Sequence, residues 1–127
     1  MLYRILFYKR AYKLGNNKQK QSSLFLNILV ESISKKIYST KTGTETLELC
    51  QKNLDIDLIL MDVEMPGLNG LEVTKQIRKF NKNTIIIAQT AFAMLADEEN
   101  ALQAGCDAYL SKPIQKEKLE NLINKFF

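Results

Sequence analysis

The stretch Leu58 to Met61, LILM, is a continuous run of large apolar residues, and it constrains the fold more than any other feature of the chain. A strand with one face in water alternates apolar and polar residues, whereas a strand covered on both faces is an uninterrupted apolar run. The same signature recurs in TIIIAQT at Thr84 to Thr90. Strands of this kind need helices on both faces, so the sequence predicts an α/β domain with a parallel sheet.

Strand-like and helix-like segments alternate along the rest of the chain. The other expected strands are Tyr3 to Tyr8, a short edge strand at Lys35 to Thr40, and Asp107 to Pro113. Helices are expected between the strands, because apolar residues recur there at helical spacing behind capping residues. The helix signals are Leu26 to Ile33, the capping pair Thr42 and Glu45 before an inner face of Leu47, Cys50 and Leu54, the cap Asn69 before Val73, Ile77 and Phe80, the segment Ala93 to Ala104 stopped by Gly105, and Leu119 to Phe126.

Length and composition further limit the class of protein that the chain can be. At 127 residues, with 46% hydrophobic and 25% charged residues, the chain resembles one globular domain of ordinary size. No apolar run reaches the roughly 20 residues that cross a bilayer, and basic residues interrupt Met1 to Tyr12 as a signal peptide, so we expect a cytoplasmic protein. Cys50 and Cys106 lie far apart in a chain without histidine, which predicts small core residues rather than a zinc site or a disulfide.

The net charge of +4 is concentrated at the N-terminus. Residues 1 to 30 hold six of the 18 Lys and Arg residues and none of the 14 Asp and Glu residues. A basic run of this kind is usually a solvated face or a loose tail, and no zinc finger or aromatic-studded RNA motif accompanies it. We therefore expect no direct binding of nucleic acid and no membrane partner.

Each of the last three expected strands ends on a reactive polar residue. These residues are Asp62, Thr90 and Lys112. In a doubly wound sheet the site lies outside the carboxyl ends of the strands, so this edge would combine a carboxylate, a hydroxyl and an ammonium. Such a set suits capture of a phosphoryl group, by a nucleophile, a hydrogen-bond donor and a point charge. The simpler interpretation is a surface ion pair between Asp62 and Lys112, with Thr90 as an ordinary strand residue.

Together with their flanking motifs, these residues resemble the receiver domain of two-component response regulators. The resemblance covers roughly Leu24 to Phe127 and rests on LILMDVEMPGLNG, IIIAQTAFA, AGCDAYLSKPI and, upstream, KTGTETLEL. It implies the flavodoxin-like receiver fold, a doubly wound five-stranded parallel sheet flanked by helices on both faces. Residues 1–127 would be a single receiver domain, and 1–23 a divergent basic N-terminal segment within it.

The resemblance also implies a function and a role for each site residue. Asp62 would be the phosphoacceptor in a two-component phosphorelay, attacking a phosphohistidine of a histidine kinase or histidine phosphotransfer protein. Lys112 and Thr90 would bind phosphoryl oxygens, Tyr109 would rotate as the switch, and Pro113 would follow a cis peptide bond. The output face would be Ala93 to Gly105 with the last strand and helix, open to a downstream protein or to a homodimer partner. The chain would be a signalling phosphoprotein, and not an enzyme beyond self-phosphorylation and self-dephosphorylation.

The family's metal site is where this chain departs from the resemblance. The family binds Mg²⁺ through the phosphoacceptor, here Asp62, through the backbone carbonyl at the position of Glu64, and through an acidic pair after the first strand. This chain has no Asp or Glu before Glu31, and Asn17 and Lys18 stand about where the pair is expected. Lysine cannot bind Mg²⁺, and asparagine is a poor substitute for a charged ligand of this hard cation.

Three explanations of the departure stay open. In the first, the chain is a degenerate receiver that binds partners without phosphorylation, and Lys18 supplies a fixed positive charge in place of the metal. In the second, Glu31 or another group restores the metal site. In the third, Met1 to Ser23 does not represent the ancestral segment. A further alternative, from another class, is a small phosphohydrolase with an aspartyl nucleophile. That class has a second Asp two residues after the nucleophile, where this chain has Glu64.

Overall fold

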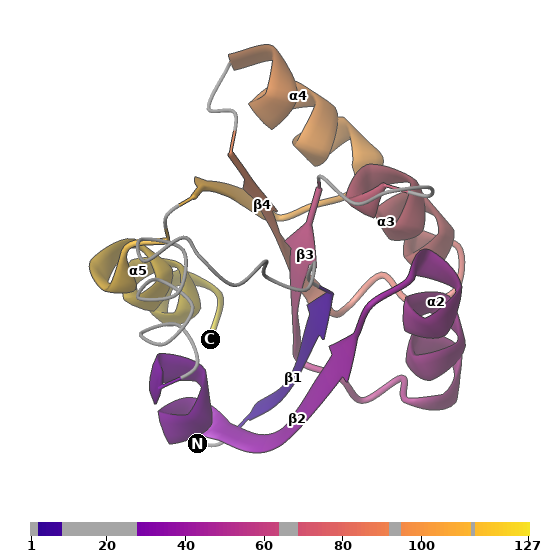
Figure 1. The fold of residues 1–127 in the computed structure, drawn as a ribbon, viewed down its shortest axis with the longest axis horizontal. Coiled ribbons are helices and arrows are strands. Elements are labelled where there is room, and N and C mark those ends of the chain that lie inside the picture. The colour runs from indigo at the N-terminus through magenta and orange to yellow at the C-terminus, as the bar shows by residue number, and fades with distance from the viewer. Residues whose placement is uncertain (1–2, 9–27, 64–68, 92–94, 113) are drawn as a thin grey trace, which may run out of the picture.

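The computed structural model describes residues 3–8, 28–63, 69–91, 95–112 and 114–127. Its centre is a five-stranded sheet in the order β2-β1-β3-β4-β5, in which every neighbouring pair of strands is parallel (Figure 1). This order is that of a flavodoxin-like doubly wound sheet, so the predicted fold class is confirmed. The strands are β1 (Tyr3–Tyr8), β2 (Ser34–Thr40), β3 (Leu58–Asp62), β4 (Ile85–Thr90) and β5 (Ala108–Ser111).

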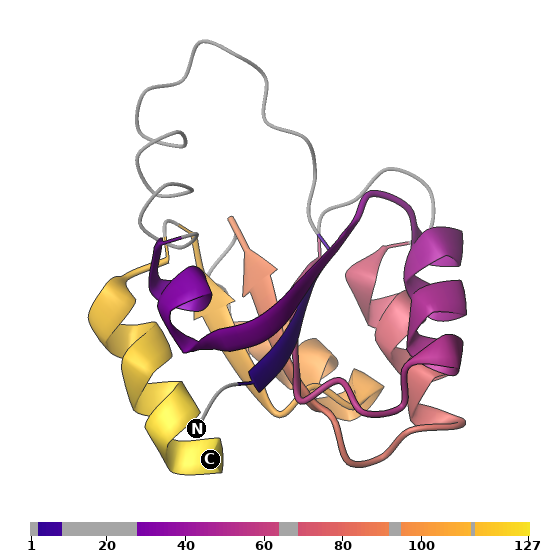
Figure 2. The same ribbon diagram turned by 90° about the horizontal axis from the view of Figure 1, so that it is seen from below.

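Helices cover both faces of this sheet. They are α2 (Gly43–Lys52), α3 (Gly70–Arg78), α4 (Leu95–Ala104) and α5 (Lys116–Phe126), and residues 28–33 are also helical. Figure 2 shows α2 and α3 on one side of the strands, with α5 and residues 28–33 on the other. None of the helices in the described part of the chain is both long and apolar enough to cross a membrane.

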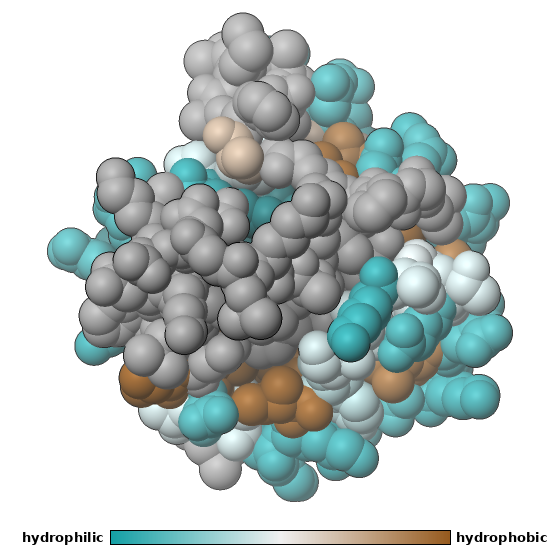
Figure 3. Space-filling view, in the orientation of Figure 1, coloured by the Kyte–Doolittle hydropathy of each residue, from teal (hydrophilic) through white to brown (hydrophobic). Residues whose placement is uncertain are grey.

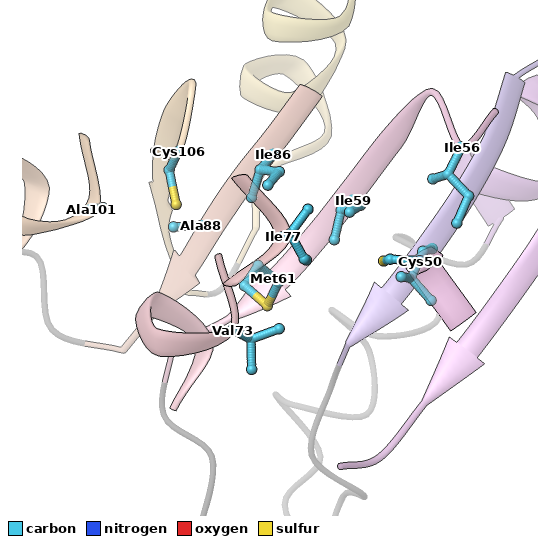
Figure 4. Packing of buried hydrophobic residues seen from close by; sticks show 11 residues of the cluster. Cys50, Ile56, Ile59, Met61, Val73, Ile77, Ile86, Ala88, Ala101 and Cys106 are labelled. Atoms are coloured by element: carbon cyan, nitrogen blue, oxygen red, sulfur yellow. The ribbon is translucent and has the colours of Figure 1, made fainter. Parts of the chain in front are cut away.

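The apolar run in β3 is continuous because alternate residues belong to two different cores. Ile59 and Met61 pack with Val73 and Ile77 of α3 in one cluster (Figure 4). Leu58 and Leu60 pack instead with residues of α5 and of the helical segment 28–33. β4 repeats the pattern, because Ile86 belongs to the first cluster and Ile87 to the second. We call these clusters the α3 core and the α5 core.

The predicted caps occur where the sequence indicates them. The Thr42 side chain accepts a hydrogen bond from Glu45 N at 3.1 Å before α2. The Asn69 Oδ1 accepts from Leu71 N and Glu72 N, both at 3.0 Å, before α3. Gly105 follows α4 with a φ of 113°, a left-handed conformation that glycine adopts without the cost of a Cβ atom. Both cysteines are buried, as predicted.

One predicted core residue is wrong. Leu54 is 61% exposed, although helical spacing from Leu47 and Cys50 places it on the inner face of α2. The helix ends at Lys52, because Asn53 turns out of helical geometry and its side-chain amide donates to Leu49 O at 2.9 Å. Ile56 takes the buried position instead, at 4% exposure.

The surface is polar over one pair of helices and partly apolar elsewhere. In Figure 3 the right-hand rim, where Figure 1 draws α2 and α3, is mostly hydrophilic. Hydrophobic atoms gather at the lower left and lower centre of that view, where Figure 1 draws residues 28–33 and β2, above a rim that is hydrophilic. Ile28 and Ile37 are the large hydrophobic residues exposed on those segments.

Candidate functional site

Asp62 and Lys112 meet at the carboxyl edge of the sheet. The Lys112 Nζ lies 2.8 Å from the Asp62 Oδ2, within a charge-assisted hydrogen bond. The Asp62 side chain is only 4% exposed, whereas that of Lys112 is 29% exposed. A carboxylate this deeply buried needs a partner, because desolvating an unpaired charge costs several kcal/mol. The pair is therefore partly buried, and not the surface ion pair of the simpler interpretation.

The pair spans three strands. Asp62 ends β3, Lys112 follows β5, and β4 lies between those strands. The Lys112 side chain must therefore cross β4 to reach the carboxylate. The backbone fixes where it begins, because Lys112 N donates to Thr90 O at 2.6 Å.

Thr90 and Tyr109 lie on the other face of the sheet. Thr90 is the last residue of β4 and is 3% exposed. By strand alternation its side chain shares the face of Ile86 and Ala88, which belong to the α3 core. Tyr109 packs against the same core, and its register partner on β4 is Ala88. The structure thus brings Asp62 and Lys112 into contact, and it places Thr90 and Tyr109 on a common face, opposite the one that carries the pair.

The N-terminus of α3 packs against the backbone of Asp62. A Cβ atom added to Gly70 would lie 2.4 Å from Asp62 O and 2.9 Å from the Met61 Cγ, so only glycine fits here. Gly70 N donates to Val63 O at 3.3 Å, which joins the helix to the end of β3. We did not predict this role for Gly70, although the adjacent Asn69-Gly70 pair was a usable signal.

Gln89 is a second residue that sequence reasoning missed. It is 6% exposed and is the register partner of Asp62 on β4. Its Nε2 is one of two buried side-chain polar atoms with no hydrogen-bond partner in the described part of the chain, the other being Thr84 Oγ1. The signal was a polar residue inside the buried run IIIAQT.

The remaining predicted site residues lie outside the described residues. They are Asn17, Lys18, Glu64 and Pro113. Within the described residues, no group of three or more His, Cys, Asp or Glu side chains could hold a metal ion. Asp62 is the one predicted metal ligand among the described residues, because Glu64 and the positions expected for the acidic pair lie outside them. The described residues therefore hold one of the several oxygen ligands that Mg²⁺ takes.

Comparison with known proteins identifies the family of this chain and several of its relatives. The family model of the response regulator receiver domain matches residues 16–124. The polar-differentiation response regulator DivK of Brucella anthropi is 40% identical over 100 residues, which cover 77% of this chain and 80% of DivK. The family match includes Asp62, Thr90 and Lys112.

Solved structures of receiver domains superpose on nearly the whole chain. The receiver domain of the Saccharomyces cerevisiae response regulator Ssk1, solved in complex with the histidine phosphotransfer protein Ypd1, has a TM-score of 0.81 at 26% identity, covering 98% of this chain and 88% of that one. The receiver domain of the sensor histidine kinase PA1611 from Pseudomonas aeruginosa has a TM-score of 0.77 at 26% identity, covering 99% and 98%. That structure holds a magnesium ion in its active-site cleft.

Proposed function

Because this chain belongs to the response regulator receiver domain family, we propose that it is a phosphoacceptor in two-component phosphorelay signalling, with Asp62 as the acceptor residue. Receiver domains of this family are signalling domains and not classical enzymes. The observation that carries the proposal is the buried Asp62 carboxylate at the end of β3, held by the Lys112 Nζ at 2.8 Å. A nucleophile and a cation are thereby oriented together before any phosphoryl group arrives.

The proposed chemistry is an in-line displacement at phosphorus. A carboxylate oxygen of Asp62 attacks the phosphorus of a phosphohistidine on the donor protein, the P–N bond breaks, and the imidazole leaves with the bonding electrons. The product is an acyl phosphate on Asp62. Lys112 already lies at the carboxylate, so its charge offsets the negative charge that accumulates when the phosphoryl group joins it.

The proposed switch runs from Thr90 to Tyr109. Thr90 donates a hydrogen bond to a phosphoryl oxygen, and the movement of its loop opens space into which Tyr109 rotates. The shared sheet face of these residues supports this pathway. Tyr109 packs against the α3 core, and Thr90 follows Ile86 and Ala88 of that core by strand alternation. The output face would then comprise α4, β5 and α5, which would bind a downstream protein or a second copy of the chain.

The proposed partner upstream is a histidine kinase or a histidine phosphotransfer protein, acting in the cytoplasm. The similarity to Ssk1, whose receiver domain was solved with the phosphotransfer protein Ypd1, supports this class of partner. Mg²⁺ is the proposed cofactor, by analogy with the magnesium site of the PA1611 receiver domain. When bound, it would shield the negative charges of the two reacting groups from each other, with Asp62 and the Glu64 carbonyl as its ligands here.

Intact-mass measurement after incubation with acetyl phosphate tests the proposal. With Mg²⁺ present, the wild-type protein should gain a single adduct of roughly 80 Da, the mass of one phosphoryl group. Asp62→Asn removes the nucleophile and should abolish the adduct, whereas Asp55→Asn, an exposed carboxylate before β3, should leave it unchanged. A parallel sample with a chelator measures the dependence on Mg²⁺. No adduct on the wild type would favour the alternative, a degenerate receiver that binds partners without phosphorylation.

A further inference from the structure

Gln89 is the register partner of the candidate phosphoacceptor on the neighbouring strand, and neither the resemblance nor the proposed chemistry gives it a role. We propose that Gln89 is an additional hydrogen-bond donor to the phosphoryl group on Asp62. This inference rests on the proposed function, because it requires a phosphoryl group at Asp62. The ligand class is a tetrahedral oxyanion bound to the carboxylate.

The sheet register places Gln89 on the same face as Asp62. The pair Leu60 and Ile87, two residues before them on the same strands, belongs to the α5 core. Side chains alternate with a period of two, so Asp62 and Gln89 share that face. Directly paired residues on neighbouring strands have Cβ atoms about 5 Å apart, so a glutamine side chain reaches a group attached to the neighbouring carboxylate.

The path of Lys112 places Gln89 at the centre of the site. Leu110, the register partner of Gln89 on β5, also belongs to the α5 core, and Lys112 lies two residues after it. Lys112 therefore leaves β5 on the same face and crosses β4 to reach Asp62. Gln89 is the β4 residue paired with Asp62 on that face, so Lys112 crosses β4 near the position of Gln89.

The missing hydrogen-bond partner is the observation that points to a ligand. Gln89 is 6% exposed, and its Nε2 finds no acceptor among the described residues. A buried donor without an acceptor costs free energy, and an apolar residue such as leucine would avoid that cost in a strand of this kind. A phosphoryl group brings three acceptor oxygens. The unphosphorylated protein thus carries a cost that phosphorylation removes, which makes the amide selective for the phosphorylated state.

Beryllofluoride, a mimic of the phosphoryl group on a carboxylate, tests the inference. Gln89→Met keeps a long unbranched side chain but removes the amide, and Gln89→Leu serves as a second variant if the first does not fold. We expect beryllofluoride affinity, measured by titration with Mg²⁺ present, to fall about tenfold or more, as for loss of one hydrogen bond to a charged group. The midpoint of urea unfolding without beryllofluoride should stay equal or rise, because the unpaired donor is gone.

Thr84→Val is the matched control. Thr84 Oγ1 is the other unpartnered buried atom among the described residues, on a residue that is 3% exposed. It precedes β4 at the opposite end of the strand, roughly 16 Å from Gln89 at the usual rise per residue. Removing this hydroxyl should preserve or raise stability in the same way and leave beryllofluoride affinity unchanged.

Two results would overturn the inference alone, and a third would remove its premise. Unchanged or tighter beryllofluoride binding by Gln89→Met would show that the amide does not contact the bound group. A lower unfolding midpoint for that variant would show that the amide is a structural group in the unphosphorylated protein. No beryllofluoride binding by the wild type would contradict the proposed function, and the role of Gln89 would fall with it.

Discussion

Gly70 is the residue that sets how closely α3 approaches the candidate site. Its Cα faces the backbone carbonyl of Asp62 and the side chain of Met61, and an added Cβ would lie 2.4 and 2.9 Å from them. A backbone carbonyl cannot rotate away as the end of a flexible side chain can. The helix therefore meets the end of β3 at a contact distance that only glycine permits.

We predict that Gly70→Ala lowers the free energy of unfolding by about 1–3 kcal/mol, the usual cost of overpacking a filled interior. The sign of this change in stability is informative. Alanine has a higher helix propensity than glycine, so the substitution would raise stability if there were room for the Cβ atom. Urea unfolding measures the change. Lys75→Ala, at an exposed position of the same helix, should change stability by no more than about 0.5 kcal/mol. Equal or greater stability of Gly70→Ala would contradict the close approach.

The site residues differ in how far the sequence predicts them. Asp62 and Lys112 were predicted to share one edge, because each ends or follows a strand and parallel strands end at the same edge. Gln89 was missed, because its meaning depends on which residue of β3 it faces. That register is a tertiary property, and a single glutamine in a buried run looks like an ordinary strand residue until the pairing with Asp62 is known.

At the scale of elements, Arg78 joins the end of α3 to the starts of β4 and β5. Its guanidinium donates to three backbone carbonyls, Gly105 O at 2.8 Å, Asn81 O at 3.2 Å and Thr84 O at 2.8 Å. It also pairs with the Asp107 Oδ2 at 2.9 Å. Asp107 in turn accepts from Ile86 N at 2.9 Å, so the cluster closes the edge of the sheet opposite the candidate site.

We predict that Arg78→Lys destabilises the protein by about 2–4 kcal/mol. Hydrogen bonds to a charged group contribute about 1.5–3 kcal/mol each, and a lysine ammonium cannot reach the same spread of acceptors as the planar guanidinium. The free energy of unfolding in urea is the measurement. Lys79→Ala, on the neighbouring exposed position, is the control and should be close to neutral. A loss below about 0.5 kcal/mol, the range of ordinary surface substitutions, would mean that Arg78 is not a structural clamp.

Element boundaries show what local sequence can and cannot predict. The caps Thr42 and Asn69 were predicted because capping depends on residues three positions apart, which the sequence displays. The burial of Leu54 was predicted wrongly because helical periodicity was continued past Lys52. The side-chain amide and the backbone N–H of Asn53 both donate to Leu49 O, and Asn53 itself leaves helical geometry, which periodicity does not show.

At the scale of the whole molecule, the pKa values of the two cysteines depend on their burial in the α3 core. Cys50 comes from α2 and Cys106 lies just before β5, and both belong to the α3 core (Figure 4). Burial raises the pKa of Cys50 from 9.0 to about 12. Burial also raises the pKa of Cys106 to about 11, although the Thr74 hydroxyl and Arg78 act in the opposite direction.

These pKa values predict a loss of stability at alkaline pH. Above pH 9 each thiol loses its proton in the unfolded state but keeps it in the folded state. Its contribution to the free energy of unfolding is therefore complete below pH 9 and falls above it. The fall amounts to about 1.4 kcal/mol per pH unit for each thiol, up to pH 11 for Cys106. Relative to Cys106→Ala, the wild type should therefore lose part of its stability advantage between pH 9 and 11 in urea unfolding. A constant difference over that range would contradict the burial of the thiol, and a constant difference between pH 6 and 8 is the expected baseline.

Acceptance of a phosphoryl group by Asp62 is the chemical step on which the proposed signalling function depends. Borohydride reduces an acyl phosphate to an alcohol and so converts a phosphorylated aspartate into homoserine. The most direct test is to treat the protein with acetyl phosphate and Mg²⁺, reduce it with borohydride, and map the modified peptide by tandem mass spectrometry. We predict homoserine at position 62 and at no other aspartate. Homoserine elsewhere, or none under conditions that label another receiver domain in the same experiment, would contradict the claim.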